Sequence, residues 1–418
     1  MAFTRTIILI RNDARCGGTK YPVYFQEILF KPLLRWLSDA LFAAGGRSFC
    51  VVREDACLDD LILPCFSTLL SDLLVLDASS ENILGDVSSY LYEKEGEVLF
   101  ITAPVLLTGH AVDSFSIAHM ASGNLLTELQ ADDNHPSGTY GFSLADSRRV
   151  LSYLDERFDF GSACRKMRGD GLVLGSYAVS DGSGGVARVR NPSELMLVRR
   201  AMQTSVLESH MLRGVSVLDP AGTLISSEAV IGRDTTLLPG VIIQGNTVIG
   251  EDCEIGPYTL LSDCTVGDRS TINASQVFDS AIGSDVQVGP FAYVRPNCGV
   301  GDRAKIGDFV ELKNSQIGAG TKVPHLSYVG DADLGESVNI GCGTIVVNYD
   351  GREKHRTTVG DGAFIGCNTN LVAPVEVHKD AYTAAGSTIT KDVPAGALAV
   401  ARARQENKEG WVAKNRPR

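Results

Sequence analysis

Residues 231–261, IGRDTTLLPGVIIQGNTVIGEDCEIGPYTLL, decide the fold because an apolar residue returns at every sixth position. The members of this series are Ile231, Leu237, Ile243, Ile249, Ile255 and Leu261. A helix repeats about every 3.6 residues and a half-buried strand about every two, so neither produces this period. The pattern predicts a solenoid of short strands with a triangular cross-section, in which each side of a coil turns one apolar residue inward.

The same period continues through the C-terminal half of the chain. It returns from Ile282 to Leu312 and from Val359 to Ile389, and glycine often follows the apolar residue, as in Ile249-Gly250. We therefore expect a small residue such as glycine at each corner. The repeat breaks at residues 348–358, NYDGREKHRTT. Interruptions of a repeat tend to carry function, and the alternative is an uneventful surface loop.

The N-terminal half has a different pattern. Apolar runs at residues 6–10, 48–52, 72–77 and 97–102 alternate with helix-like stretches, such as the apolar-periodic segment 25–44. This alternation predicts an α/β domain. A helix is then expected over 191–213, with Asn191 as its N-cap and Pro192 in the first turn. The predicted parts are an α/β domain (1–190), a connector helix (191–214), the solenoid (215–400) and a basic tail (401–418).

Composition excludes several classes of protein. The 418 residues include 50 acidic and 38 basic side chains, and a net charge of −12 disfavours a nucleic-acid partner. The apolar run before Arg11 is too short for a signal peptide or a membrane span, so we expect a cytoplasmic protein. Ten cysteines without CxxC spacing are expected to be free thiols. The tail is either a solvated terminus or a contact for an anionic ligand.

Several motifs between Gly289 and Trp411 occur in a familiar order. They are GPFAYVRP, FVELKNSQIGAGTKVPHLSYVGDADLG, VNIGCGTIVVNYDG, AAGSTITKDVP and QENKEGW. This order resembles the acetyltransferase half of the GlmU-type bifunctional N-acetylglucosamine-1-phosphate uridyltransferase / glucosamine-1-phosphate N-acetyltransferases. The resemblance implies a left-handed parallel β-helix, a homotrimer, and acetyl transfer from acetyl-CoA to the amine of glucosamine-1-phosphate. That reaction belongs to UDP-N-acetylglucosamine and peptidoglycan precursor synthesis.

The resemblance also implies a set of site residues. The amine must lose a proton near neutral pH, and His325 in HLSY matches the family's general base. The remaining matches are Arg295, Lys313, Tyr328 and Asn339 for the sugar phosphate, Asn348 and Tyr349 for orienting the base and the cofactor side, and Cys342, Cys367, Ala385 and Arg402 for acetyl-CoA. The family commonly has alanine at position 342 and serine at position 367. Taken singly, these residues could equally be a structural histidine, solvated charges, turn residues and corner positions.

The N-terminal half keeps the family's pattern only in part. Gly17-Gly18-Thr19 survives from the glycine-rich loop of a Rossmann-like nucleotidyltransferase, but Arg11 and Asn12 stand where small residues are expected. Ala103 replaces the aspartate that helps to bind magnesium, and Asn191 matches the second metal position. We therefore expect that uridyl transfer is lost, with Mg²⁺ required only if it persists. The alternatives are a bifunctional enzyme and a non-catalytic hexapeptide scaffold.

Overall fold

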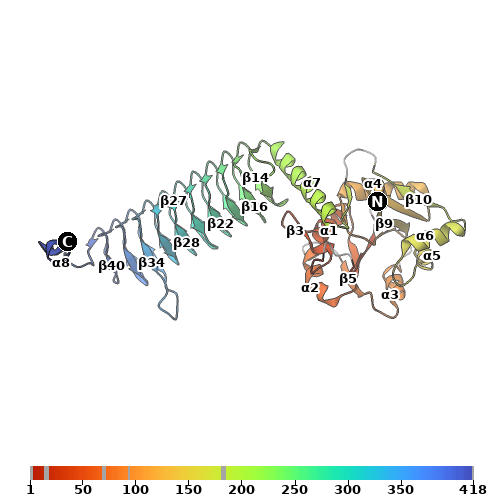
Figure 1. Cartoon of the computed structure of the whole chain (residues 1–418), viewed down its shortest axis with the longest axis horizontal. Coiled ribbons are helices and arrows are strands. Elements are labelled where there is room, and N and C mark those ends of the chain that lie inside the picture. The colour runs from red at the N-terminus through yellow and green to blue at the C-terminus, as the bar shows by residue number, and fades with distance from the viewer. Residues whose placement is uncertain (1–2, 14–17, 68–71, 93–94, 180–184, 417–418) are drawn as a thin grey trace. The chain divides into compact units, whose positions relative to one another are not determined.

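The computed structural model describes residues 3–13, 18–67, 72–92, 95–179 and 185–416. The chain forms two compact units, Met1–Met202 and Gln203–Arg418. The first is an α/β domain and the second contains the solenoid (Figure 1). Gly17, and with it part of the GGT motif, lies outside the described residues.

A seven-stranded mixed sheet forms the centre of the first unit. Its order is β10 (Leu174–Tyr177), β8 (Leu126–Gln130), β9 (Pro136–Ser143), β6 (Glu97–Ile101), β1 (Arg5–Ile10), β4 (Ser48–Arg53) and β5 (Asp72–Asp77). Strand β9 runs antiparallel to both of its neighbours, and the other pairs are parallel. Successive residues of β1, such as Ile7 and Ile8, point to opposite faces and enter different buried clusters, so both faces of the sheet are covered.

Helices and short hairpins complete this unit. The helices are α1 (Leu33–Ala43), α2 (Asp59–Ile62), α3 (Ile83–Tyr90), α4 (Gly109–Ser122), α5 (Ser147–Leu151) and α6 (Phe160–Gly169), with 3₁₀ turns at η1 (Val23–Phe25), η2 (Ala56–Leu58) and η3 (Leu63–Cys65). Two small sheets pair β2 (Glu27–Ile28) with β3 (Lys31–Pro32) and β7 (Val105–Leu107) with β11 (Val186–Arg188).

The helix-like interpretation of segment 25–44 is wrong for its first eight residues. Helix α1 begins only at Leu33, and β2 and β3 form a tight hairpin before it. The hairpin turns through Leu29 and Phe30, whose φ angles are +48° and +67°. These values lie outside the helical region, and Pro32 fixes the residue before the helix in an extended conformation.

Helix α7 (Pro192–Met211) follows the first domain. Asn191 caps it, because its Oδ1 accepts a hydrogen bond from the Glu194 backbone N–H at 2.9 Å. The Glu194 carboxylate reaches back to the N–H of Arg190 at 2.7 Å. At the other end, Leu207 is buried in the core of the solenoid.

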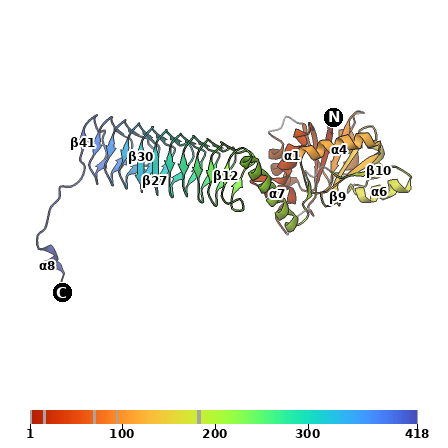
Figure 2. The ribbon, with the colours of Figure 1, turned by 90° about the horizontal axis from the view of Figure 1, so that it is seen from above.

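The second unit is a left-handed parallel β-helix with three faces (Figure 2). The first face stacks β12 (Ser216–Val217), β15 (Thr236–Leu237), β18 (Glu254–Ile255), β21 (Thr271–Ile272), β24 (Gln287–Val288), β27 (Lys305–Asp308), β30 (Lys322–His325), β33 (Asn339–Ile340), β36 (Phe364–Ile365), β39 (Tyr382–Thr383) and β41 (Leu398–Ala399). The second stacks β13 (Leu224–Ile225), β16 (Ile242–Gln244), β19 (Leu260–Ser262), β22 (Gln276–Phe278), β25 (Tyr293–Val294), β28 (Glu311–Lys313), β31 (Tyr328–Gly330), β34 (Ile345–Val347), β37 (Asn370–Val372) and β40 (Thr388–Ile389).

The third face closes the triangle. It stacks β14 (Val230–Ile231), β17 (Val248–Ile249), β20 (Thr265–Val266), β23 (Ala281–Ile282), β26 (Gly299–Val300), β29 (Gln316–Ile317), β32 (Ala332–Leu334), β35 (Thr357–Val359) and β38 (Val375–Val377). The residues at the six-residue period point inward from all three faces, and Ile243, Ile255 and Leu261 have no exposed surface. The period therefore predicted both the three-sided core and its members.

Glycine occupies some corners of the coils, such as Gly320 and Gly343 with positive φ, and it has a second role beside the inward residues. A Cβ added to Gly232 would lie 2.5 Å from the Gly250 carbonyl carbon of the next coil, so position 232 must be glycine for these two coils to stack. Larger residues follow the inward position elsewhere, as Arg295 does after Val294. Many corner positions with positive φ are instead occupied by polar residues such as Asp234, Asp252 and Asn297. Short polar side chains tolerate the left-handed conformation better than most residues other than glycine.

Two segments depart from the regular coils. The interruption at 348–358 projects from the solenoid between β34 and β35 (Figure 1). After β41 the chain leaves the coils as an exposed tail that ends in the five-residue helix α8 (Trp411–Asn415).

Candidate functional site

Five residues from successive coils lie in a row along the solenoid axis, at the corner between the first and second faces. Asp308 and His325 are paired in register. The pairs Lys322 with Asn339 and Tyr328 with Ile345 extend that register from both sides of the corner. In the same way, the pairs of β33 with β36 and of β34 with β37 align Cys342 with Cys367. The pairs of β36 with β39 and of β37 with β40 align Cys367 with Ala385. We call this set the turn column: Asp308, His325, Cys342, Cys367 and Ala385.

His325 and Asp308 form a hydrogen-bonded pair within the turn column. The His325 Nδ1 and Asp308 Oδ1 atoms are 2.5 Å apart, and the imidazole side chain is about half exposed, at 52%. The hydrogen bond from His325 holds the pKa of the Asp308 carboxyl below its usual range. A carboxylate on Nδ1 fixes the proton there and leaves Nε2 as the free acceptor.

Sequence reasoning missed Asp308. It stands 17 residues before His325, which is one coil of the solenoid, so the repeat could have placed the two side by side. The prediction assigned the orienting role to Asn348 and Tyr349. Within this chain the Asn348 amide donates to Asp331 at 2.5 Å and to the Tyr328 hydroxyl at 3.3 Å. An orienting role for Asn348 and Tyr349 stays a prediction.

The predicted phosphate ligands stack at the ends of the second-face strands, across that face from the turn column. The pairing of Val294 with Leu312 places Arg295 and Lys313, the next residues, on neighbouring coils. Arg295 makes an ion pair with Glu311 at 2.9 Å, and Lys313 lies 3.9 Å from Asp331. Both cations are partly exposed and therefore available to an anionic ligand.

Tyr328 and Asp331 join this group. A Cβ added to Gly330 would lie 2.3 Å from the Tyr328 hydroxyl, so the phenol folds over a position that must remain glycine. Burial alone would raise the pKa of Asp331, but hydrogen bonds from Asn314 and Asn348 lower it below the usual value. Asp331 thus stays an anion among the cations.

The loop at 348–358 is held by hydrogen bonds within the loop and by an ion pair to the coil below it. Asp350 accepts hydrogen bonds from the backbone N–H groups of Arg352 and Glu353 and from His355, at 2.7 to 2.9 Å. The Glu353 N–H contributes most to holding the pKa of Asp350 well below its ordinary value. Near the C-terminal end of the loop, the Arg356 guanidinium donates two hydrogen bonds of 2.5 Å to the Asp333 carboxylate.

This loop brings Lys354 to Lys313. Contact with the neighbouring Lys313 ammonium lowers the pKa of Lys354. Two like charges held together favour a ligand that carries several negative charges, such as a phosphate. Sequence reasoning missed Lys354, and its signal was its place in the one interruption that had been singled out for function.

The remaining predicted residues lie on the same part of the solenoid. Asn339 starts β33, the strand that leads into Cys342. Tyr349 is exposed and forms a β-bridge with Lys354 across the loop. Cys342, Cys367 and Ala385 continue the turn column beyond His325, and the Arg402 Cδ atom lies 3.9 Å from the position of a Cβ on Gly386, next to Ala385. The column therefore leads from the histidine toward a basic side chain.

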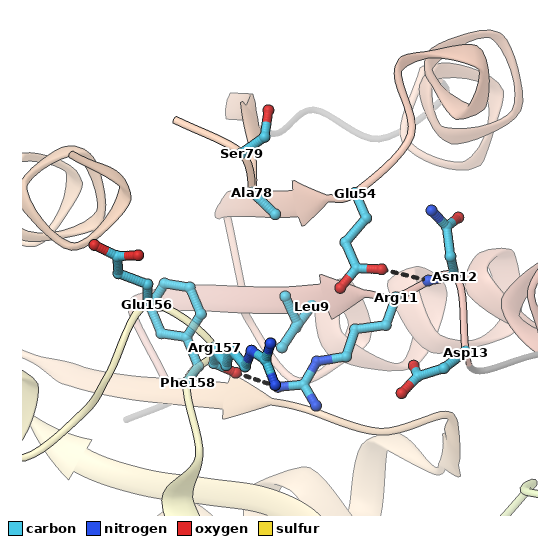
Figure 3. Close-up of a pocket in the computed structure, with 10 residues that line it drawn as sticks. All are labelled: Leu9, Arg11, Asn12, Asp13, Glu54, Ala78, Ser79, Glu156, Arg157 and Phe158. Carbon is cyan, nitrogen blue, oxygen red and sulfur yellow. Dashed lines mark hydrogen bonds between the residues drawn. The ribbon is translucent and has the colours of Figure 1, made fainter. Parts of the chain in front are cut away.

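A hollow lies in the first domain (Figure 3). Its volume is about 590 Å³, and it lies at the carboxyl ends of β1, β4 and β5. Arg11 donates to the Arg157 carbonyl across this hollow, and the Asn12 N–H donates to Glu54 at 2.8 Å. Ligands of open α/β sheets bind at such strand ends, so the location suits a ligand site.

The two family positions for magnesium do not fit the ion. Ala103 offers no side-chain oxygen, and Gly138 packs so closely that an added Cβ would lie 2.8 Å from the Ala103 Cβ. The Asn191 Oδ1 already accepts the Glu194 N–H of the helix cap. In the part of the chain that the structure describes, no group of three or more His, Cys, Asp or Glu side chains is placed to hold a metal ion.

Together, the repeat, the histidine with its carboxylate and the adjacent cations define a transferase of the hexapeptide-repeat class. The family model described as bacterial transferase hexapeptide (six repeats) matches residues 228–262 and 279–314. The bifunctional protein GlmU of Caldanaerobacter subterraneus subsp. tengcongensis is 37% identical over 97% of this chain and 97% of its own. That of Acetivibrio thermocellus is 46% identical over 98% and 97%. The chain belongs to the GlmU family of bifunctional proteins.

These relatives bear on the first domain as well. The bifunctional protein GlmU of Brevibacillus brevis is 57% identical over 51% of this chain, whereas the two matches above cover both domains. The expectation that uridyl transfer is lost therefore finds no support in the comparisons, since relatives named as bifunctional match along the whole chain. Within the described ranges, no helix is both long and apolar enough to cross a bilayer.

Proposed function

We propose that this chain transfers the acetyl group of acetyl-CoA to the amine of glucosamine-1-phosphate. The observation that carries the proposal is the turn column, which joins the Asp308–His325 pair to the predicted acetyl-CoA positions, together with the stacked cations Arg295 and Lys313 at the ends of the second-face strands. The amine attacks the thioester carbonyl, a C–N bond forms and the C–S bond breaks. His325 Nε2 accepts the amine proton, and coenzyme A leaves as the thiol.

The cations at the end of the second face supply substrate specificity in this proposal. Arg295, Lys313 and Lys354 surround the phosphate, and Tyr328 and Asn339 contact the sugar phosphate from neighbouring coils. Acetyl-CoA lies along Cys342, Cys367 and Ala385, with Arg402 on its phosphates. In this proposal the reaction takes place on the predicted solenoid (215–400) and the basic tail (401–418), which follow the α/β domain (1–190) and the connector helix (191–214).

The experiment is a product assay with purified chain, acetyl-CoA and either glucosamine-1-phosphate or glucosamine. We expect N-acetylglucosamine-1-phosphate and one equivalent of coenzyme A thiol from the phosphorylated substrate, and much less product from glucosamine because the cations lose their partner. Absence of product from glucosamine-1-phosphate at any substrate concentration would favour the scaffold alternative.

We also propose that the chain acts as a homotrimer. Phe309 and Leu326 directly follow Asp308 and His325 of the turn column, and Phe291 has the equivalent position one coil earlier. All three apolar residues are more than half exposed. The Phe291 and Phe309 rings stack at 5.4 Å, and all three residues have positive φ. Bulky residues are costly in that conformation, and an apolar ridge of this kind suits an interface between copies.

Uridyl transfer from UTP to N-acetylglucosamine-1-phosphate is the second candidate function. The full-length match to bifunctional relatives favours it, and Mg²⁺ would be its metal. Because Ala103 and Asn191 do not fit the ion, other residues would have to hold it. Pyrophosphate release from UTP, N-acetylglucosamine-1-phosphate and Mg²⁺ tests this activity, with the Arg11→Ala variant as a probe of the 590 Å³ hollow.

A further inference from the structure

Cys342 and Cys367 lie directly opposite each other on neighbouring coils. On one side of the corner Ile340 pairs with Ile365, and on the other side Ile345 pairs with Asn370. Both pairs give the same register, which matches residue 342 with residue 367. The Asn368 N–H donates to the Cys342 carbonyl at 2.8 Å, so the two backbones remain hydrogen-bonded at the corner itself.

The spacing of the coils suits a bond between the two sulfur atoms. Adjacent strands lie about 4.8 Å apart, and disulfides join residues whose Cα atoms are about 4.4 to 6.8 Å apart. The following residues, Gly343 and Asn368, share the left-handed conformation with φ of +77° and +54°. The two cysteines therefore occupy equivalent positions in the turns of neighbouring coils.

Both thiols are free and reach the surface. Cys367 is exposed and Cys342 is partly exposed. Glycines flank Cys342 at 341 and 343, so its own coil places no side chain beside the sulfur atom. By contrast, burial raises the pKa of Cys264, on an earlier coil, to about 11, which suppresses the reactive thiolate there.

We propose that Cys342 and Cys367 are a dithiol modification site that closes reversibly to a disulfide by exchange with a small-molecule disulfide. One cysteine thiolate attacks a sulfur of the reagent, which forms a mixed disulfide and releases one thiol. The second cysteine attacks the cysteinyl sulfur, forms the Cys342–Cys367 bond and releases the second thiol. The two cysteines lose two electrons and two protons, and the reagent gains them.

The effect on catalysis rests on the proposed function. Cys342 is one coil away from His325, and Cys367 is one coil further toward Ala385. A disulfide there replaces two thiols in the path predicted for acetyl-CoA. Closure is therefore expected to suppress acetyl transfer, and a reducing dithiol is expected to restore it.

The experiment uses the full chain with Cys57 and Cys164 changed to alanine, because these are the exposed and partly exposed thiols among the described residues of the first domain. Cys16, which lies outside the described residues, is changed to alanine as well. The protein is treated with oxidised glutathione and analysed by intact mass and peptide mapping, beside the matched variants Cys342→Ala and Cys367→Ala. We expect a cross-link between the two peptides in the parent protein. Each single variant should instead retain one glutathione on its remaining cysteine.

Two outcomes would overturn the proposal. Glutathione retained on both cysteines of the parent protein, without a cross-link, contradicts the dithiol site. A cross-link that leaves formation of the N-acetylated product unchanged contradicts its effect on catalysis. The mass measurement does not depend on activity, so it remains decisive even if the untreated protein forms no product and the proposed function fails.

Discussion

At the scale of single residues, the site depends on two side chains that lie outside the predicted set. Asp308 holds the Nδ1 atom of His325, and Lys354 meets Lys313. Both act on a proposed ligand or base through charge. Asparagine removes the charge of Asp308 with little change in size, and alanine and arginine at position 354 remove or keep the charge of Lys354.

Replacement of Asp308 by asparagine should lower kcat by about 10- to 100-fold, because an amide no longer stabilises the imidazolium or fixes its tautomer. The carboxyl has a lowered pKa, so the anion is present above that pKa and its effect is lost as the pH falls through it. The acid limb of the kcat/KM profile should also move to lower pH. Glu336→Gln, an exposed carboxylate away from the turn column, is the control. An unchanged profile for Asp308→Asn would contradict the pairing.

Lys354→Ala should raise KM for glucosamine-1-phosphate by about 10- to 100-fold, as expected for one charge-assisted hydrogen bond of about 1.5 to 3 kcal/mol. Since its neighbour lowers the pKa of Lys354, the wild-type KM should rise with increasing pH as the ammonium loses its proton. Lys354→Arg keeps the charge and should remove that rise. Equal alkaline profiles for wild type and the arginine variant would argue against Lys354 as a phosphate ligand.

At the scale of elements, the coils at Gly232 and Gly250 stack so closely that glycine at position 232 is a steric requirement. Gly232→Ala should destabilise the solenoid by about 1 to 3 kcal/mol, because the new Cβ meets only backbone atoms of the next coil, at 2.5 to 2.7 Å. Gly299→Ala is the matched control, since its added Cβ meets the flexible Gln316 side chain first. Thermal unfolding followed by circular dichroism distinguishes them. A similar midpoint for both variants would contradict the stacking argument.

The same element explains what could be predicted from the sequence. The six-residue period arises because one residue on each side of a coil is buried. The series from Ile231 to Leu261 therefore predicted the three faces, the core and the residues that point inward. It carries no information about which outward side chains share a corner, unless residues are also counted coil by coil. This is why His325 was found by its motif while Asp308 was missed. The helix start at Leu33 was missed because the tight turn at Leu29 and Phe30 contains no glycine.

At the scale of the whole molecule, the apolar ridge beside the turn column is the proposed contact between copies. Phe309→Asp should convert a trimer into single chains, because a buried carboxylate without a partner is strongly unfavourable. Light scattering after gel filtration measures the mass. Tyr92→Asp, an exposed aromatic position in the first domain, should leave the mass at three chains. A Phe309→Asp trimer would remove the ridge from the interface.

As the proposed general base of acetyl transfer, His325 is probed by the turnover of the His325→Ala variant. Acetyl transfer from acetyl-CoA to glucosamine-1-phosphate should fall by about 10²- to 10⁴-fold, with the oligomeric state unchanged. His378→Ala, which removes another exposed imidazole beside a carboxylate, 3.3 Å from Glu376, should retain full turnover. Wild-type turnover in His325→Ala would contradict the account.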